Sequence, residues 1–373
     1  MGTNKGRCLI ITAMRYIITI IITPALCCLL ACSGCDKIFP EKGYDYQIMK
    51  SANPENLVFL LCATGSDIVG IDTTTFTVEA WVRMKNMSIG GVAKLPQGGI
   101  AFTHHRRASD NAWGNTLYVT DNGYNITNKY PICLSPMAPK VLNDVLMVGS
   151  SAIEEGNKHK FQLYDTKTFS LKKEFLLEDM IDAWKIAEYE NYAYFGVDVP
   201  PPFRDRAHSY IVQLDVSNGD TTEFSVKDDF FTEAALSIWR HDTTLYVFNV
   251  VSKDACAVNV NNRHAKFVKI SQYPEVVSLN VNHIFSPKEI NGFVYGFLGK
   301  HNEEGNYICY WMKLNSTSLA LEDIKPLAIP EGYTNGAYQL HIGRFFVIQV
   351  ETNVLFIDVE SGEIVKTVYL NFN

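Results

Sequence analysis

Residues 354–370 read VLFIDVESGEIVKTVYL. An apolar run ends at Asp358, a polar segment with Ser361 and Gly362 follows, and a second run rich in β-branched residues completes the stretch. Asp, Ser and Gly favour a tight turn because Asp and Ser side chains bond the local backbone and Gly tolerates positive φ. The stretch therefore predicts two antiparallel strands joined by a short turn.

The same outline recurs along the whole chain. Apolar strands end at acidic or amide residues spaced 49, 44, 50, 46, 54 and 43 positions apart, and the spacing averages about 48. This period is near the roughly 40–50 residues of a four-stranded propeller blade. The end residues, termed anchors below, are Asp72, Asp121, Asp165, Asp215, Asn261, Asn315 and Asp358.

The repeats predict an all-β fold, a β-propeller of four-stranded blades. Short meanders rich in Val, Ile, Tyr and Phe cannot bury their faces alone, but radial stacking buries them. Seven blades are favoured, with six as the alternative because the first unit, expected from Tyr46 onward, is poorly marked. The chain has 373 residues, of which 47% are hydrophobic. The even spread of the repeats favours one propeller domain over residues 46–373.

The first 31 residues predict a lipoprotein signal peptide. Arg15 precedes an apolar run from Tyr16 to Ala31 that ends in small residues, as secretory signals do. Residues 29–32, Leu-Leu-Ala-Cys, resemble the bacterial lipobox, in which the cysteine is lipidated and becomes the first residue of the mature chain. The predicted lipidation site is therefore Cys32.

Three alternatives remain at this end of the chain. Cys35 is a rival lipidation site, and the apolar run could be an uncleaved anchor helix. Met14 is a possible start that would give a more compact signal. After processing at Cys32, residues 32–45 would form a short polar tether.

Composition limits the partners. Residues 1–31 carry three basic residues and no acid, so the remainder has 30 basic against 40 acidic residues, a net charge of −10. An acidic domain without a basic stripe argues against nucleic acid. Four cysteines lie far apart with no C-x-x-C pair, and they are predicted to be buried free thiols: Cys62, Cys133, Cys256 and Cys309.

Two long loops supply the candidate binding residues. They lie between the second and third predicted strands of units two and four, whereas the corresponding loop of unit seven has only three residues, 351–353. In a propeller these loops share one edge with the connections between blades. Arg and aromatic side chains suit anionic or planar groups, although ordinary solvated loops have the same composition. The candidates are Arg106, Arg107, Trp113, Phe203, Arg204, Arg206 and His208.

No catalytic residue, metal site or cofactor is predicted. His104 and His105 are adjacent on an expected strand and would point to opposite faces, which makes them poor ligands of one metal. H-E-x-x-H, G-x-S-x-G, P-loop and dinucleotide-binding motifs are absent from the sequence.

The chain resembles the lipid-anchored propeller proteins of Bacteroidetes, including the TolB-like six-bladed propellers. The resemblance rests on the lipobox, on Gly91–Gly99 with Leu95 and Pro96 before an apolar strand, and on strand–turn units such as Ile211–Glu223. It implies six blades, a lipid-anchored place in the cell envelope, and no catalytic residues to carry over.

We therefore expect a lipid-anchored envelope protein, at the outer membrane, that acts as a binding or scaffold module for a protein or glycan. The alternative is a hydrolase or lyase with its site at the central channel. The binding module is favoured over the enzyme because no catalytic motif is present.

Overall fold

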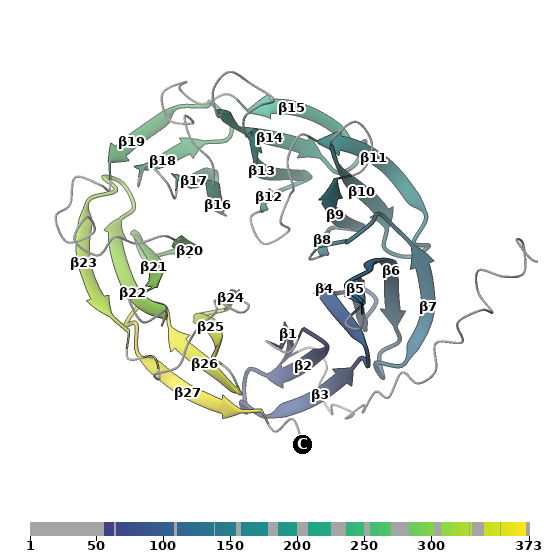
Figure 1. Ribbon diagram of the computed structural model, residues 1–373. Coiled ribbons are helices and arrows are strands. Elements are labelled where there is room, and N and C mark those ends of the chain that lie inside the picture. The colour runs from purple at the N-terminus through teal and green to yellow at the C-terminus, as the bar shows by residue number, and fades with distance from the viewer. Residues whose placement is uncertain are drawn as a thin grey trace, which may run out of the picture. The chain divides into compact units, whose positions relative to one another are not determined.

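The computed structural model describes residues 56–62, 65–107, 110–137, 139–153, 158–177, 186–199, 208–224, 236–249, 254–269, 283–301, 307–327, 329, 339–350 and 352–370. Within these ranges the chain forms 27 strands in seven antiparallel sheets. The sheets are the blades of a β-propeller (Figure 1). The seven-blade prediction is confirmed, and the six blades implied by the family resemblance are not what this chain has.

Strands pair in chain order within every blade. Blade 1 comprises β1 (Leu57–Leu61), β2 (Asp67–Asp72) and β3 (Val78–Arg83). Blade 2 comprises β4 (Met87–Lys94), β5 (Ile100–Arg107), β6 (Trp113–Thr120) and β7 (Ile126–Pro131). Blade 3 comprises β8 (Lys140–Leu142), β9 (Val145–Ile153), β10 (His159–Asp165) and β11 (Leu171–Leu177). Blade 4 comprises β12 (Ala187–Tyr189), β13 (Tyr192–Val199), β14 (His208–Asp215) and β15 (Asp220–Phe224).

The remaining three blades have the same plan. Blade 5 comprises β16 (Leu236–His241), β17 (Thr244–Asn249), β18 (Asp254–Asn259) and β19 (Ala265–Lys269). Blade 6 comprises β20 (His283–Ile290), β21 (Phe293–His301), β22 (Tyr307–Asn315) and β23 (Leu321–Pro326). Blade 7 comprises β24 (Gln339–Ile342), β25 (Phe345–Val350), β26 (Asn353–Asp358) and β27 (Ile364–Tyr369). The innermost strand expected for blade 1, residues 46–49, lies outside the described residues.

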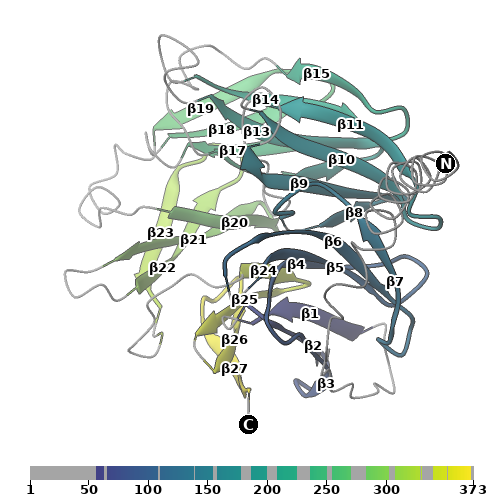
Figure 2. The same cartoon turned by 45° about the vertical axis from the view of Figure 1, so that its right-hand side comes forward.

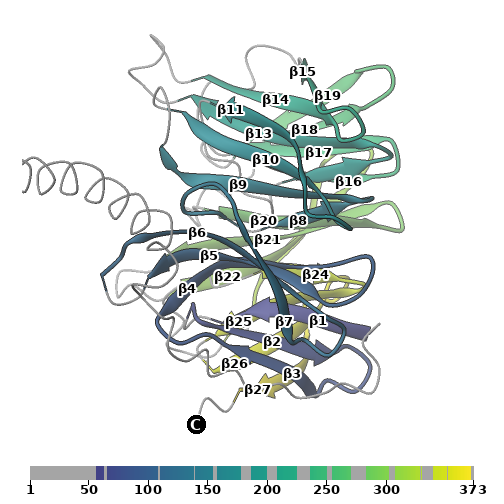
Figure 3. The ribbon, with the colours of Figure 1, turned by 90° about the vertical axis from the view of Figure 1, so that its right-hand side faces the viewer.

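Neighbouring blades stack as successive layers. Turned views show blade 3 between blades 2 and 4 (Figure 2, Figure 3). Side chains from adjacent blades form the core, as where Leu60 and Val69 of blade 1 pack with Val347 and Phe356 of blade 7. No helix among the described residues is long and apolar enough to cross a membrane.

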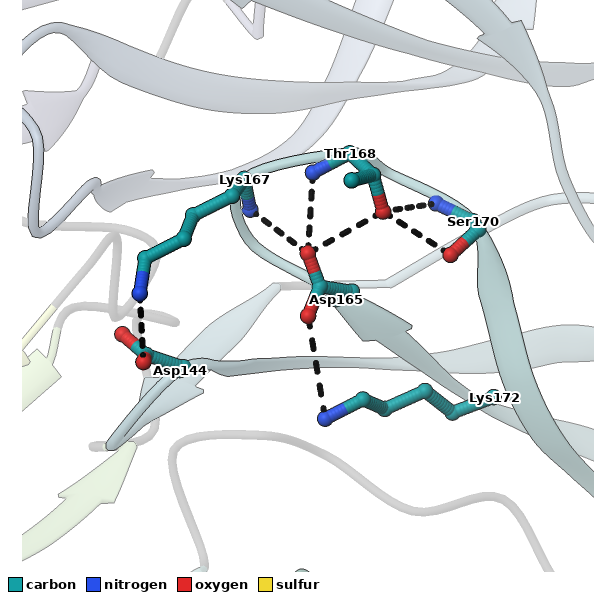
Figure 4. A network of polar contacts seen from close by, with 6 residues as sticks. All are labelled: Asp144, Asp165, Lys167, Thr168, Ser170 and Lys172. Atoms are coloured by element: carbon teal, nitrogen blue, oxygen red, sulfur yellow. Dashed lines mark hydrogen bonds and ion pairs between the residues drawn. The ribbon is translucent and has the colours of Figure 1, made fainter.

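An acidic or amide anchor organises the turn between the last two strands of each blade. In blade 3 the Asp165 carboxylate accepts hydrogen bonds from the backbone N–H of Lys167 (3.0 Å) and Thr168 (2.9 Å) and from the Thr168 hydroxyl (3.0 Å) (Figure 4). These bonds, above all the one from the Thr168 N–H, hold the pKa of Asp165 below its ordinary value. The recurring turn is therefore a side-chain-capped turn.

The structure corrects one anchor. Strand β18 ends at Asn259, whose side-chain oxygen accepts from the backbone N–H of Asn261 (3.0 Å) and Asn262 (3.2 Å). The anchor of blade 5 is therefore Asn259, and Asn261 is a turn residue. The other six predicted anchors each accept such bonds from their own turns.

In six blades, the fourth residue after the anchor has a left-handed backbone conformation. In blade 2, the third residue after the anchor has this conformation. The φ values of these left-handed turn residues lie between 54° and 75°, and the residues are Phe76, Tyr124, Phe169, Gly219, Arg263, Leu319 and Gly362. Several contact the preceding blade: Tyr124 meets the ring of Phe59 at 5.2 Å, and Phe169 meets Tyr130 at 5.1 Å.

The same contact closes the ring. Phe76 of blade 1 packs edge-on against Phe345 (5.6 Å between ring centroids) and Phe356 (5.0 Å) of blade 7. Among the described residues, blades 7 and 1 are therefore joined by the same kind of contact as other neighbouring blades, in which the left-handed turn residue packs against the preceding blade.

The four cysteines of the propeller are buried and free, as predicted. Burial raises the pKa of Cys256 and Cys309 to about 12, so both thiols stay protonated at neutral pH. They pack as small apolar side chains.

Candidate functional site

The candidate site lies on one edge of the ring, over blades 2 and 3. In an antiparallel meander, the second-to-third-strand turns and the connections to the next blade share one edge, here called the rim edge. The first-to-second-strand turns and the anchor turns share the other, here called the anchor edge. The end of β5, the start of β6, the β7–β8 connection and the end of β9 therefore meet at the rim edge.

Arg106 and Trp113 form a stacked pair. The guanidinium carbon of Arg106 lies 4.0 Å from the centre of the Trp113 ring, and the His105 ring meets the same indole edge-on at 6.1 Å. Trp113 is still 47% exposed. The buried Nε of Arg106 has no hydrogen-bond partner among the described residues. Such a cation–π contact contributes about 0.5–1 kcal/mol at an exposed site.

A histidine and two serines tie this pair to blade 3. His105 Nδ1 lies 2.9 Å from the hydroxyl of Ser135, in the β7–β8 connection, and that hydroxyl lies 2.5 Å from the Ser151 hydroxyl on β9. Burial, with help from the charge of Arg106, lowers the pKa of His105, so its imidazole is neutral at pH 7. Ser135 is fully buried, so its hydroxyl cannot reach a substrate and the cluster acts as a structural link.

Close backbone packing supports the link. A Cβ at Gly90 of β4 would come within 2.1 Å of the Pro136 carbonyl oxygen and 3.2 Å of the His105 Cβ. Only glycine lets the β7–β8 connection approach β4 this closely. The His105–Ser135 contact depends on that approach.

Two exposed aliphatic side chains flank the serine pair. Leu134 directly precedes Ser135 and is 40% exposed, and its carbonyl oxygen accepts from the Ser150 hydroxyl at 2.6 Å. Ile153 is 61% exposed and ends β9, two residues after Ser151 and across the irregular stretch in the pairing of β9 with β10. We call Arg106, Trp113, Leu134 and Ile153 the rim patch.

The structure brings together only part of the predicted set. Arg106 and Trp113 meet, whereas Arg107 forms an exposed ion pair with Asp110 of its own loop at 2.9 Å. Residues 200–207, with Phe203, Arg204 and Arg206, lie outside the described residues, as does Cys32. His208 begins β14 opposite Val199, and its side chain is also outside the described part.

Sequence reasoning missed Leu134, Ser135, Ser151 and Ile153. The only local signal was an apolar residue beside serine in two segments, residues 133–136 and 150–153. Nothing in the sequence says that these segments of different blades meet.

The alternative site at the central channel concerns the innermost strands of the described part of the chain. Within it, no three His, Cys, Asp or Glu side chains lie close enough to hold a metal. On the innermost strands, Glu188 of β12 pairs with Lys140 of β8 at 3.1 Å, and Glu289 of β20 accepts from the Tyr246 hydroxyl. These carboxylates bridge neighbouring blades.

Comparison with known proteins supports the architecture. No protein-family model matches the chain, and no curated protein matches it in sequence. Among solved structures it is similar to BamB from Moraxella catarrhalis, with a TM-score of 0.51, 10% identity, and 88% of each chain covered. Apo AztD from Citrobacter koseri has a TM-score of 0.50 and 8% identity, over 84% of this chain and 94% of that one.

A third similar structure is the dihydro-heme d1 dehydrogenase NirN in complex with DHE, with a TM-score of 0.51 and 13% identity. The match covers 87% of this chain and 65% of NirN. At these identities the likeness shows the fold alone. BamB and AztD are bacterial envelope proteins with propeller folds, and the chain described here is a seven-bladed β-propeller of the same general architecture.

Proposed function

We propose that this chain is a lipid-anchored binding or scaffold module of the bacterial cell envelope, and that the rim patch binds its partner. The address, at the outer membrane through a lipid on Cys32, is supported by the lipobox and by the likeness to envelope propellers. The observation that carries the binding role is the Arg106–Trp113 stack beside two exposed aliphatic side chains.

A protein partner fits the rim patch better than a glycan. Trp and Arg are enriched at the energetic centres of protein interfaces. Leu134 and Ile153 add exposed aliphatic groups on the same edge of the ring, and such groups gain from contact with apolar side chains. The His105–Ser135–Ser151 link holds the patch in place, which lowers the entropy lost on binding.

The indole sets the size of the effect. A Trp side chain buries at most about 250 Å², and 47% of Trp113 is exposed. Covering roughly 120 Å² at about 25 cal/mol/Å² gives a transfer free energy of at most about 3 kcal/mol. The gain in affinity is smaller, because association also costs rigid-body and side-chain entropy.

The test is a crosslinked pull-down from envelope membranes with wild type and Arg106→Ala/Trp113→Ala. We expect a protein that wild type retains and the double variant loses. The matched control is Arg240→Ala/Tyr189→Ala, which removes a cation–π pair (5.4 Å) on the anchor edge and should leave capture unchanged. Equal capture by both variants would remove the rim patch from the proposal. Capture of glycan instead of protein would favour the glycan reading.

A further inference from the structure

A polar cavity of about 420 Å³ opens between blades 5 and 6 on the anchor edge of the ring. It lies on the edge opposite the rim patch. Turns β16–β17, β18–β19 and β22–β23 form its walls together with the end of β20. It is a shallow hollow that is widely open to solvent, so a ligand bound there would be covered on one side.

A tyrosine and a glutamate from different blades form its base. Tyr246 of β17 is buried, and its hydroxyl donates to the carboxylate of Glu289 on β20. Burial and the Glu289 charge raise the pKa of Tyr246, so the phenol remains protonated at any physiological pH. The bond spans the two blades, so the base is fixed before any ligand arrives.

The walls are also built from oriented polar groups. The Asn259 amide donates to the Thr243 hydroxyl at 3.0 Å and is held by its own turn. His241 lies 3.5 Å from the Asp242 carboxylate. The hydroxyls of Ser316 and Thr317 complete the polar lining.

The lining has a definite chemical bias. No Lys or Arg is among the described residues that line it, so it offers no counter-charge to an anion. The Glu289 carboxylate already accepts from Tyr246, and the exposed Asp242 carboxylate lies 3.5 Å from the His241 ring. Oxygen lone pairs on both carboxylates can accept from further donors. Hydroxyl, amide and imidazole groups around them can both donate and accept.

We infer that this cavity binds a small neutral polyhydroxylated ligand, of the size of one sugar ring. Such a ligand presents hydroxyls that donate to the Glu289 and Asp242 carboxylates and accept from the surrounding hydroxyl and amide groups. The inference is independent of the proposed partner at the rim patch, because the two sites lie on opposite edges and share no residue.

The test compares binding of sugars that share one ring size but differ in net charge. Saturation-transfer NMR on the purified full-length protein would compare the neutral hexoses glucose, galactose and mannose with cationic glucosamine and anionic glucuronate. We expect at least one neutral hexose to bind and glucuronate to be rejected. Binding of glucosamine alone would overturn the inference in favour of a cation site, and binding of no hexose would overturn it outright.

Variants locate the site. Glu289→Gln and Asp242→Asn should each weaken hexose binding about tenfold, since a neutral amide replaces a charged acceptor of the hydroxyl hydrogen bonds. Asp242 is exposed and has a φ of 45°, which Asn tolerates, so Asp242→Asn should fold normally. If both variants bind the hexose as wild type does, the ligand is elsewhere.

Two controls separate a local effect from a global one. Tyr194→Phe removes the equivalent hydroxyl of blade 4, which accepts from Gln213 at 3.1 Å, and should leave hexose binding unchanged. Arg106→Ala/Trp113→Ala should also bind the hexose normally. Loss of binding in either control would show that the effect is not specific to this cavity and would count against the inference.

Discussion

Replacing Gly362 with alanine tests how the blades are joined. Gly362 follows the anchor Asp358 with a φ of 67°, and a Cβ there would lie 2.7 Å from Cγ and 2.8 Å from Cδ1 of Trp311 on blade 6. The indole cannot retreat easily, because its N–H donates to the Val359 carbonyl oxygen at 2.7 Å. The substitution therefore strains the backbone and forces the contact between blades 6 and 7 apart.

Gly343 provides a matched substitution. Its φ is 55°, and nothing lies within 4 Å of the position of its Cβ. An alanine in left-handed backbone destabilises the folded state by roughly 1–2 kcal/mol relative to glycine. Alanine also lowers the conformational entropy of the unfolded chain, which stabilises the fold by about 0.4–1 kcal/mol. Gly343→Ala should therefore lower the free energy of unfolding by about 1 kcal/mol. Overpacking adds about 1–3 kcal/mol, so Gly362→Ala should lower it by about 2–4 kcal/mol.

Urea unfolding followed by Trp fluorescence and by circular dichroism measures both variants. The difference between them isolates the contact with Trp311, because the backbone term is common to both. If the two variants lose the same stability within about 0.5 kcal/mol, the contact between the turn residue and the preceding blade does not hold the blades together and the reasoning fails.

Three further outcomes are expected. Asp165→Ala should lower the urea midpoint of unfolding, because three hydrogen-bond donors of the turn lose their acceptor. Asp165→Asn should keep a midpoint near that of wild type, since Asn315 has the same role in blade 6. Equal losses in the two variants would contradict the capping role. The folded-state pKa of His105 is depressed, so the unfolded chain binds more protons near pH 6.5 and stability falls as pH drops through that value. His105→Gln should flatten this dependence relative to wild type in unfolding measurements from pH 5 to 7, and an unchanged slope would rule the residue out. Cys32→Ala should abolish incorporation of a radiolabelled fatty acid and release the protein from membranes, with Cys35→Ala as the control; the reverse pattern would move the lipid to Cys35.

Much of the fold could be predicted because its repeating signal is local. An Asp at a strand end followed by Ser and Gly is a turn whatever surrounds it, as at Asp358. The error at blade 5 has a physical cause: residues 259–262 read NVNN, and any of these asparagines can cap a turn. Hydrogen bonding in the folded sheet selects Asn259.

The left-handed turn residues could not be predicted from local preference. Phe76 and Tyr124 take a backbone conformation that large side chains normally avoid. Packing against aromatic rings of the neighbouring blade compensates for that strain, and such contacts between residues far apart in sequence leave no local pattern.

Only part of the candidate site could be predicted from the sequence. The sequence predicted one long loop that contained both Arg106 and Trp113, and its length and composition indicated both. The structure extends β5 through Arg106 and begins β6 at Trp113, so both lie at strand ends. Leu134 and Ile153 belong to a connection and to another blade, and their closeness to that loop follows from the radial arrangement of blades. Residues of a propeller surface converge in space and not in sequence, so composition alone could not assemble the patch.

The turn that reaches back to the preceding blade also gives the ring a direction. Each blade offers one surface forward and a different one backward, as in a head-to-tail oligomer whose rotation closes on itself. The contact of Phe76 with Phe345 and Phe356 makes the interface between blades 7 and 1 chemically similar to the others. Among the described residues, blade 1 contains only N-terminal strands and blade 7 only C-terminal strands. The interface between blades 7 and 1 therefore does not differ in kind from the other interfaces between blades. A circular permutation that opens any connection between blades keeps all of these contacts between blades.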